Sequence, residues 1–193
     1  SSQLRSSVVS HAKTLGYTSR SATASNTTVD VFLNTSNPSA TMSAGTVFTA
    51  SVGDVSYQFV TTAAVTSILS GSTIEFTDVV IYEGSYVSSR YTVDTQNVEQ
   101  RFLINDDRAD TATLTVKVQN STSDSTLTTY ILATDIAALT STSNVYFLQE
   151  VEDGKYEIYF GDGILGTTLE DNNILIMDYV VTNKGAANGA AIF

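Results

Sequence analysis

The sequence has 193 residues, of which 42% are hydrophobic, so it is long and apolar enough to fold with a buried core. Its 9 Lys and Arg residues against 20 Asp and Glu residues give a net charge of -11, which disfavours nucleic acid as a partner because a phosphate backbone would be repelled. The absence of Cys and the single His11 exclude disulfides, thiol nucleophiles and a multi-histidine metal site within one chain.

The N-terminal residues have the spacing of an amphipathic helix. Apolar side chains recur every three or four residues, and Gly16 follows where a helix often ends. The apolar positions are Leu4, Val8, Ala12 and Leu15. They predict a helix over residues 2–15, within a region 1–16 that lacks a clear cap and is interpreted as the end of a longer helical region. This stripe would pack either onto the rest of the chain or into a helix bundle with partner subunits.

From Thr27 onward the composition changes to Thr, Ser, Val and Tyr with an alternation of period two, which is typical of β-strands. The predicted strands cover residues 27–34, 46–51, 57–62, 73–84, 100–105, 113–120, 126–133, 144–151, 156–160 and 173–182. We therefore predict a mainly β fold, α+β at the margin, in which residues 17–193 form antiparallel, sandwich-like sheets. Residues of about 86–138 are interpreted as a smaller subdomain inserted into this β domain.

Three segments indicate how the strands are connected and which faces are buried. In TLTVKV the alternation predicts one apolar face and one face in water. The apolar face would hold Leu114, Val116 and Val118, and the wet face Thr113, Thr115 and Lys117. Residues 120–127, NSTSDSTL, are predicted as a polar hairpin tip, and residues 133–143, ATDIAALTSTS, as a short helix or a crossing loop.

The stretch FGDGILG, residues 160–166, places Asp162 among three glycines directly after the strand pattern KYEIY. One hypothesis is a hydrolase that uses Asp162 and Glu157 as a carboxylate pair. A calcium loop is disfavoured because DGILGTTLEDNN supplies only its first Asp in the required pattern of ligands. A phosphate-binding loop is disfavoured because no Gly-Lys-Ser/Thr follows.

The structural interpretation of the same stretch needs no chemistry. The glycines would supply positive φ or allow close approach of the backbone, and Asp162 would accept hydrogen bonds from nearby amides. Glu157 would lie on the wet face of its strand. The preceding VEDGKY would be a hairpin turn built on Asp153 and Gly154. The sequence favours this interpretation.

Residues 156–190 also resemble the signature of the baseplate J-like family of contractile phage tails: an FGDG turn, a further glycine, a strand ending in Tyr, then Thr-Asn, Gly and Asn-Gly. Matching positions are Phe160, Gly161, Asp162, Gly163, Gly166, Ile176, Tyr179, Thr182, Asn183, Gly185, Asn188 and Gly189. Upstream, LRSSVVSHAKTLGY and SAGTVFTAS are similar to further elements of the family. Among its members, the chain looks like a middle fragment of the inner wedge subunits of T-even-like phages. Asn172 stands where the family often has glycine, but Asn tolerates a left-handed backbone.

The resemblance implies a structural, non-enzymatic role without a metal or other cofactor. Such subunits join wedges into a ring around the tail hub through contacts with other wedge proteins and a second copy of themselves. They belong to the virion tail baseplate and are assembled in the host cytoplasm. No membrane partner is expected, since no apolar run approaches the ~20 residues that span a bilayer, and no small-molecule substrate is implied.

A second hypothesis, from another functional class, is a carbohydrate-binding or adhesin-like β domain of a tail. It depends on the 10 Tyr residues of the sequence, whose rings could form an exposed strip for sugars. Tyrosine is also common on sheet surfaces and in protein interfaces, so composition alone does not choose between the two hypotheses.

Overall fold

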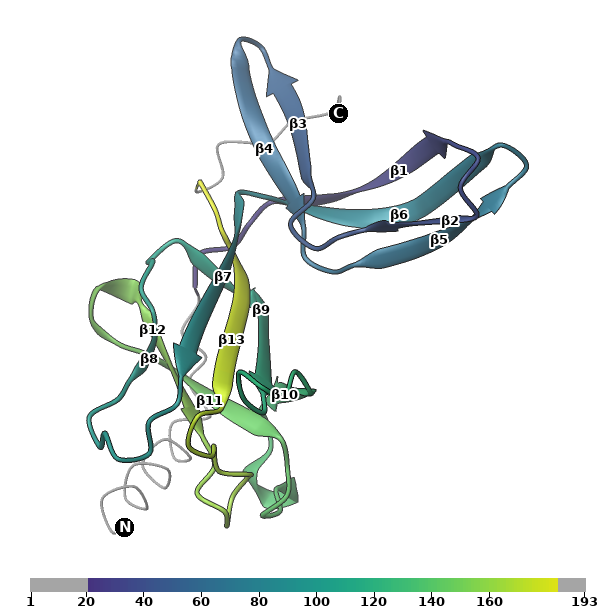
Figure 1. Cartoon of the computed structure of the whole chain (residues 1–193). Coiled ribbons are helices and arrows are strands. Elements are labelled where there is room, and N and C mark those ends of the chain that lie inside the picture. Colours follow the sequence, from purple (N-terminus) through teal and green to yellow (C-terminus); the bar gives the residue numbers. More distant parts are fainter. Residues whose placement is uncertain (1–20, 184–193) are drawn as a thin grey trace. The chain divides into compact units, whose positions relative to one another are not determined.

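The computed structural model describes residues 21–183, and this part of the chain is mainly β (Figure 1). The predicted mainly β class is therefore confirmed. The structured segments between residues 21 and 183 are strands and two short 3-10 helices, η1 (Ile136–Ala138) and η2 (Glu152–Gly154). The predicted helix at residues 2–15, with Leu4, Val8, Ala12 and Leu15, lies outside the described residues.

The first six strands form one sheet in which β6 is the longest element and pairs with three neighbours. The strands are β1 (Asn26–Asn34), β2 (Ser39–Met42), β3 (Val47–Val52), β4 (Val55–Thr61), β5 (Val65–Ser70) and β6 (Thr73–Glu83). β1 pairs along one edge of β6, while β5 and β4 share the other edge, at the start and at the end of β6 respectively. β2 and β3 complete the sheet by pairing with β5 and β4.

One face of this sheet is held by an apolar cluster. Its buried members include Phe59, Ile74, Phe76 and Ile81, and Val31 and Leu69 pack against them. In β6 the apolar residues alternate with exposed ones until Asp78, which has a φ of 53°. There the register between β1 and β6 shifts, and the Asp78 amide donates to Asp30 Oδ1 at 2.9 Å. This β-bulge returns Val79 to the core face, so the alternation continues on the same side.

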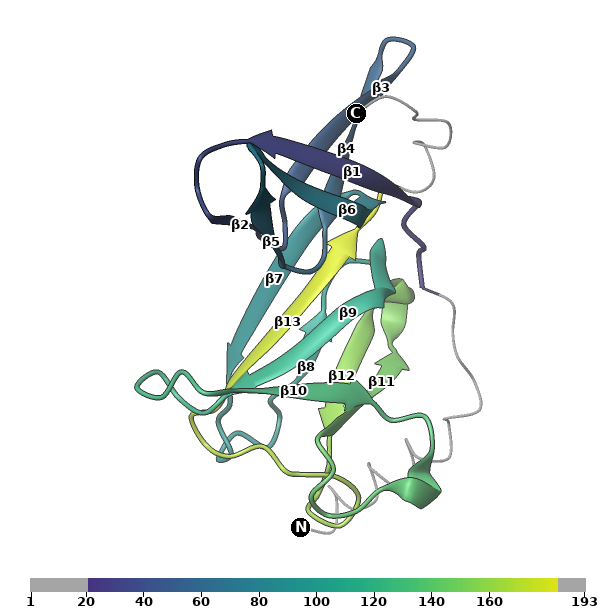
Figure 2. The ribbon, with the colours of Figure 1, turned by 90° about the vertical axis from the view of Figure 1, so that its right-hand side faces the viewer.

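The remaining seven strands form a second sheet in the order β7-β13-β9-β10-β11-β12-β8. They are β7 (Ser85–Thr92), β8 (Phe102–Ile104), β9 (Ala109–Gln119), β10 (Leu127–Leu132), β11 (Val145–Glu150), β12 (Tyr156–Phe160) and β13 (Ile174–Val181). Figures 1 and 2 show β7, β13 and β9 side by side. β13 lies between β7 and β9 in this order and is almost entirely buried.

One strand pair departs from the predicted antiparallel arrangement. β10 and β11 run parallel, with Ile131 opposite Val145 and Leu132 opposite Tyr146. A parallel pair needs a crossover connection, and residues 133–144 supply it with the single turn η1. The crossing loop and the short helix that the sequence left as alternatives are thus both present in one connection.

Several local predictions are confirmed. Residues 120–126 form the polar tip between β9 and β10, where the Asn120 amide donates to the Thr126 carbonyl at 3.0 Å. η2 forms the turn between β11 and β12, with Asp153 and Gly154 at φ of 61° and 70°. In β9, Leu114, Val116 and Val118 are buried as predicted. Thr113 was predicted on the wet face and is buried instead: its hydroxyl donates to the Asp110 carbonyl of the same strand and accepts from the Val180 amide of β13.

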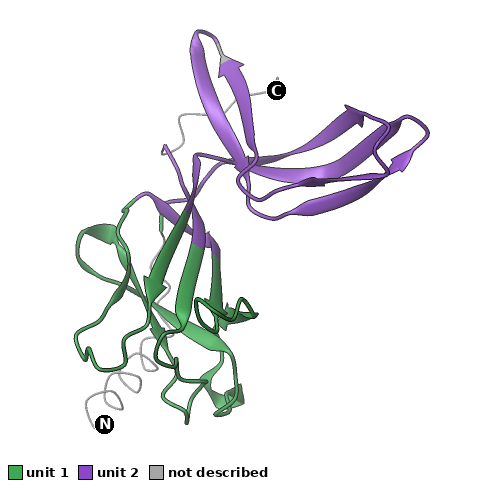
Figure 3. Cartoon of the chain, viewed as in Figure 1, with its two compact units in different colours: residues 1–21, 88–107, 115–177 green, residues 22–87, 108–114, 178–193 purple. Residues whose placement is uncertain are grey.

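The described residues divide into two compact units (Figure 3). Unit 1 holds Ser21 and residues 88–107 and 115–177, and unit 2 holds residues 22–87, 108–114 and 178–183. The six-stranded sheet belongs to unit 2, whereas β7, β9 and β13 contribute residues to both units. Between residues 21 and 183, no helix has the length and hydropathy required to cross a membrane.

Candidate functional site

The glycine turn after β12 requires glycine for two different reasons. A Cβ atom at Gly161 would overlap the backbone of Gly166, although Gly161 does not have a positive φ. Gly163 and Gly166 have φ of 82° and 90°, in the left-handed region that favours glycine. The Gly163 amide donates to the Gly166 carbonyl at 3.0 Å. The turn therefore uses both properties of glycine: close approach at Gly161 and Gly166, and positive φ at Gly163 and Gly166.

Asp162 serves this turn as a local acceptor. Its Oδ1 accepts hydrogen bonds from the amides of Ile164 and Leu165, both at 3.0 Å. Such Asx-type bonds fix a turn without any ligand. The side chain of Leu165 then packs against the apolar cluster of Ala133, Val145 and Phe147. Hydrogen bonds within the turn and the packing of Leu165 against the core of unit 1 therefore both hold the turn in place.

The same turn holds the crossover between the parallel strands. The Gly166 amide donates to the Thr140 carbonyl, and the Thr167 amide to the Ser143 carbonyl, both at 2.9 Å. Thr140 and Ser143 lie in the connection from β10 to β11. Phe160, at the start of the turn, packs edge-on against the rings of Phe102 and Tyr130 with centroids 5.9 and 5.4 Å apart. The turn of residues 160–167 therefore fixes the connection between the parallel strands, and we call it the clamp.

Glu157 is buried, so its predicted position on a wet face is wrong. The side chains of Arg101 and Tyr159 cover its carboxylate, and the residue is only 4% exposed. Arg101 Nε donates to Oε1 at 2.9 Å and Nη2 to Oε2 at 2.5 Å, a two-bonded ion pair, and the Tyr159 hydroxyl donates to Oε2 at 2.7 Å. Burial and the bond to Glu157 raise the pKa of Tyr159, and the bond to this carboxylate raises the pKa of Arg101.

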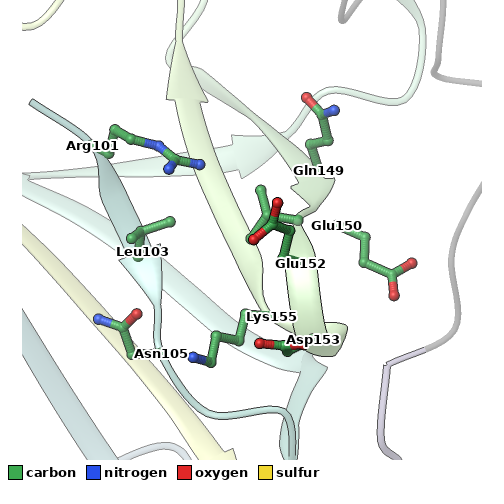
Figure 4. Close-up of a pocket in the computed structure, with 9 residues that line it drawn as sticks. Arg101, Leu103, Asn105, Gln149, Glu150, Glu152, Asp153 and Lys155 are labelled. Carbon is green, nitrogen blue, oxygen red and sulfur yellow. The ribbon is translucent and has the colours of Figure 1, made fainter. Parts of the chain in front are cut away.

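An open hollow of about 460 Å³ lies beside this ion pair, and Figure 4 shows its lining. The lining carries both signs of charge, with Arg101 and Lys155 on one hand and Glu150, Glu152 and Asp153 on the other. In Figure 4 the side chain of Glu150 points away from Arg101. Such a mixed lining does not select for a ligand of one charge.

The carboxylates of the hydrolase hypothesis do not meet in this hollow. Neither Glu157 nor Asp162 belongs to its lining. Glu157 is engaged by Arg101 and Tyr159, and Asp162 by two amides of its own turn. In residues 21–183 no group of three or more His, Cys, Asp or Glu side chains is placed to hold a metal ion.

A second buried carboxylate, Glu83 at the end of β6, binds the residues that follow β13. It is 0% exposed, and its Oε2 accepts from the Thr182 hydroxyl at 2.7 Å and from the Asn183 amide at 3.1 Å. Its Oε1 accepts from the Asn183 side-chain amide at 2.8 Å. The Thr-Asn pair is therefore joined to the end of β6, within unit 2, through three donors to one carboxylate.

Residues 87–192 match the family described as bacteriophage baseplate wedge protein gp6, third domain, and this match spans more than half of the chain. The chain belongs to this family. No curated protein sequence matches it.

The matched part of this baseplate wedge protein contains β8 to β13 and nearly all of β7, and therefore the glycine turn and the Thr-Asn pair. Strands β1 to β6 lie outside the matched residues. Of the other signature positions, Tyr179 is 4% exposed and Ile176 is 7% exposed in β13. Asn172 has a φ of 65°, which confirms that Asn adopts a left-handed turn here. Gly185, Asn188 and Gly189 lie outside the described residues.

Sequence reasoning missed the partners of the buried carboxylates. Arg101 lies 56 residues before Glu157, and Glu83 lies 100 residues before Asn183. No local spacing connects residues so distant in the chain. The only signal was indirect: Glu157 interrupts an otherwise apolar and aromatic strand, which is where a buried charge requires a partner.

Proposed function

We propose that the chain is a rigid structural part of a tail baseplate wedge. In the full-length protein it would contact other wedge proteins and a second copy of itself, and so join wedges into a ring around the tail hub. The family match carries this proposal, because it identifies the chain as a baseplate wedge domain. We further propose that the protein is of the baseplate J-like, T-even-like type, that it resides in the virion and that it is assembled in the host cytoplasm.

The arrangement of the matched sheet supports a load-bearing role. The clamp on the parallel pair consists of backbone bonds and packed glycines, which tolerate little deformation. The buried carboxylates of Glu157 and Glu83 are each fixed by three donor bonds. Fully satisfied polar networks of this kind favour one rigid arrangement.

We infer that the protein is not an enzyme, since the two carboxylates of the hydrolase hypothesis are engaged in structural bonds. The carbohydrate-binding alternative has no specific support. Each tyrosine between residues 21 and 183 is buried or half-buried, so these rings do not form the exposed strip that this alternative needs.

The test is assembly in solution. The full-length protein, mixed with the purified wedge proteins of the same phage, should sediment as a complex of defined stoichiometry. If all subunits stay separate at about micromolar concentration, where an affinity near −8 kcal/mol would already be visible, the proposed assembly role is wrong.

A further inference from the structure

The six-stranded sheet carries exposed apolar side chains on the face opposite its core. Phe32 in β1 is 62% exposed and Ile68 in β5 is 74% exposed. Phe32 lies opposite Glu75 of β6, and Ile68 is one residue beyond the pair Leu69–Ile74, so it flanks Glu75 from the other side. The three side chains form one row across three neighbouring strands, which we call the Phe32 row.

The orientation of this row follows from the alternation along β6. Ile74 and Phe76 belong to the apolar cluster, so Glu75 between them points to the other face. Val80, between the buried Val79 and Ile81, points to that same face and is 42% exposed. Adjacent strands lie about 4.8 Å apart, which places Phe32 and Ile68 roughly 10 Å from each other with a carboxylate between them. Large apolar side chains grouped beside polar ones are typical of a protein-binding surface.

The segment that carries this row has charges of one sign only. Residues 21–89 contain no Lys, Arg or His, whereas they contain Asp30, Asp54, Glu75, Asp78 and Glu83. Asp30 and Asp78 meet at the bulge of the same sheet and are both exposed. A second copy of the chain would bring the same acidic sheet to this surface, and like charges across an interface are repulsive. Nucleic acid would be repelled for the same reason.

We propose that the Phe32 row docks another baseplate protein, through a surface whose apolar side chains are rimmed by Lys or Arg. This inference rests on the proposed wedge function and names the chemistry of one partner. It concerns strands outside the residues that match the wedge family. The apolar row supplies the buried centre of the contact, and Glu75, Asp30 and Asp78 supply the charged rim that steers association.

The experiment measures the affinity of the full-length protein for each purified wedge protein of the same phage. Two variants change the row: the double variant Phe32→Ser/Ile68→Ser and the charge reversal Glu75→Lys. Two matched controls make the same kinds of change on the loop between β7 and β8: Val98→Ser, at a residue that is 93% exposed, and Glu99→Lys, also exposed. Thermal melting of each variant verifies that the protein is folded.

We expect one wedge protein to lose about tenfold or more in affinity with either row variant and to keep its affinity with both controls. Its binding to the unchanged protein should also be weaker at about 0.5 M than at about 0.1 M salt, because salt screens the charged rim. Unchanged binding of the row variants overturns this proposal and leaves the wedge function standing. A loss that affects only self-association also overturns this proposal and leaves the wedge function standing. If the unchanged protein binds no wedge protein, both proposals are wrong.

Discussion

Replacement of Gly161 by Ala tests whether the glycine turn depends on close backbone approach. The added Cβ would overlap the backbone carbon and oxygen of Gly166, which cannot move away by a change of rotamer. Opening the turn would strain or break two hydrogen bonds, from Gly163 to Gly166 and from Gly166 to Thr140. At about 1 kcal/mol for each bond and about 1–3 kcal/mol for overpacking, the free energy of unfolding should fall by about 3–5 kcal/mol.

Gly163→Ala provides the comparison within the same turn. Gly163 has a φ of 82°, but the nearest neighbour of an added Cβ would be Thr168 Cγ2 at an ordinary contact distance of 3.6 Å. Only the left-handed backbone is then penalised, by about 1 kcal/mol. Gly53→Ala, with a φ of 59° and no atom within 4 Å of the added Cβ, is a matched control in the β3–β4 turn. Asp162→Asn retains an acceptor for the two amides and should cost less than about 1 kcal/mol.

Calorimetry and hydrogen exchange separate these cases. For a chain of this length we expect a loss of at least about 6 °C in Tm with Gly161→Ala and about 2–4 °C with Gly163→Ala or Gly53→Ala. Gly161→Ala should also speed the exchange of the Gly166 and Thr167 amides, which hold the crossover. Equal losses for Gly161→Ala and Gly163→Ala would refute the close-approach argument. A larger loss of Tm with Asp162→Asn than with either glycine variant would show that the negative charge of Asp162 matters, and would make this residue a functional candidate again.

Three further predictions concern buried polar groups. Thr113→Val should lower the free energy of unfolding by about 1–3 kcal/mol in urea melts, because the Val180 amide loses its acceptor. Thr113→Ser keeps a hydroxyl and should retain most of the stability. Equal losses with the two variants would contradict the role of this hydrogen bond. Glu83→Gln should lower the free energy of unfolding by about 2–3 kcal/mol, because its NH2 group would face a donor of Thr182 or Asn183 where Glu83 has an acceptor oxygen. Glu75→Gln, at an exposed residue, should be nearly neutral. Similar losses with the two variants would count against the bonds between Glu83 and the Thr-Asn pair. Burial raises the pKa of Tyr146 to about 12. Because the tyrosine of the unfolded chain ionises first, the free energy of unfolding should keep its full value below pH ~10 and should fall as the pH rises from about 10 to about 12. Tyr146→Phe should flatten that decline in an alkaline melting series, and an unchanged slope would exclude Tyr146 as its source.

The strands that the sequence predicted carry either an alternation of apolar and polar residues, as in β9, or a longer apolar run, as in β13, and those it missed lack both patterns. β2, SATM, and β5, VTSILS, are short and rich in small residues, and β7 contains three serines among its eight residues. These segments are strands because neighbouring strands pair with them: β5 pairs with the longer β6, and β2 pairs with β5. Local propensity is weak in such cases, and tertiary pairing decides.

The turn and the buried charges differ in how far sequence could predict them. The roles of Gly161, Gly163 and Asp162 follow from local backbone geometry, which a short stretch of sequence encodes. The burial of Glu157 depends on Arg101, which is distant in the chain. The parallel pairing of β10 and β11 likewise depends on how the crossover returns to the sheet. Neither feature has a local pattern that sequence reasoning can use.

The proposed role of this chain as a structural part of the baseplate wedge can be tested with a cryo-electron microscopy map of tails purified from the phage that encodes it. We expect density in every wedge that fits the sheet β7-β13-β9-β10-β11-β12-β8, with its parallel pair and clamped glycine turn. A well-resolved baseplate in which no wedge contains this sheet would contradict the claim.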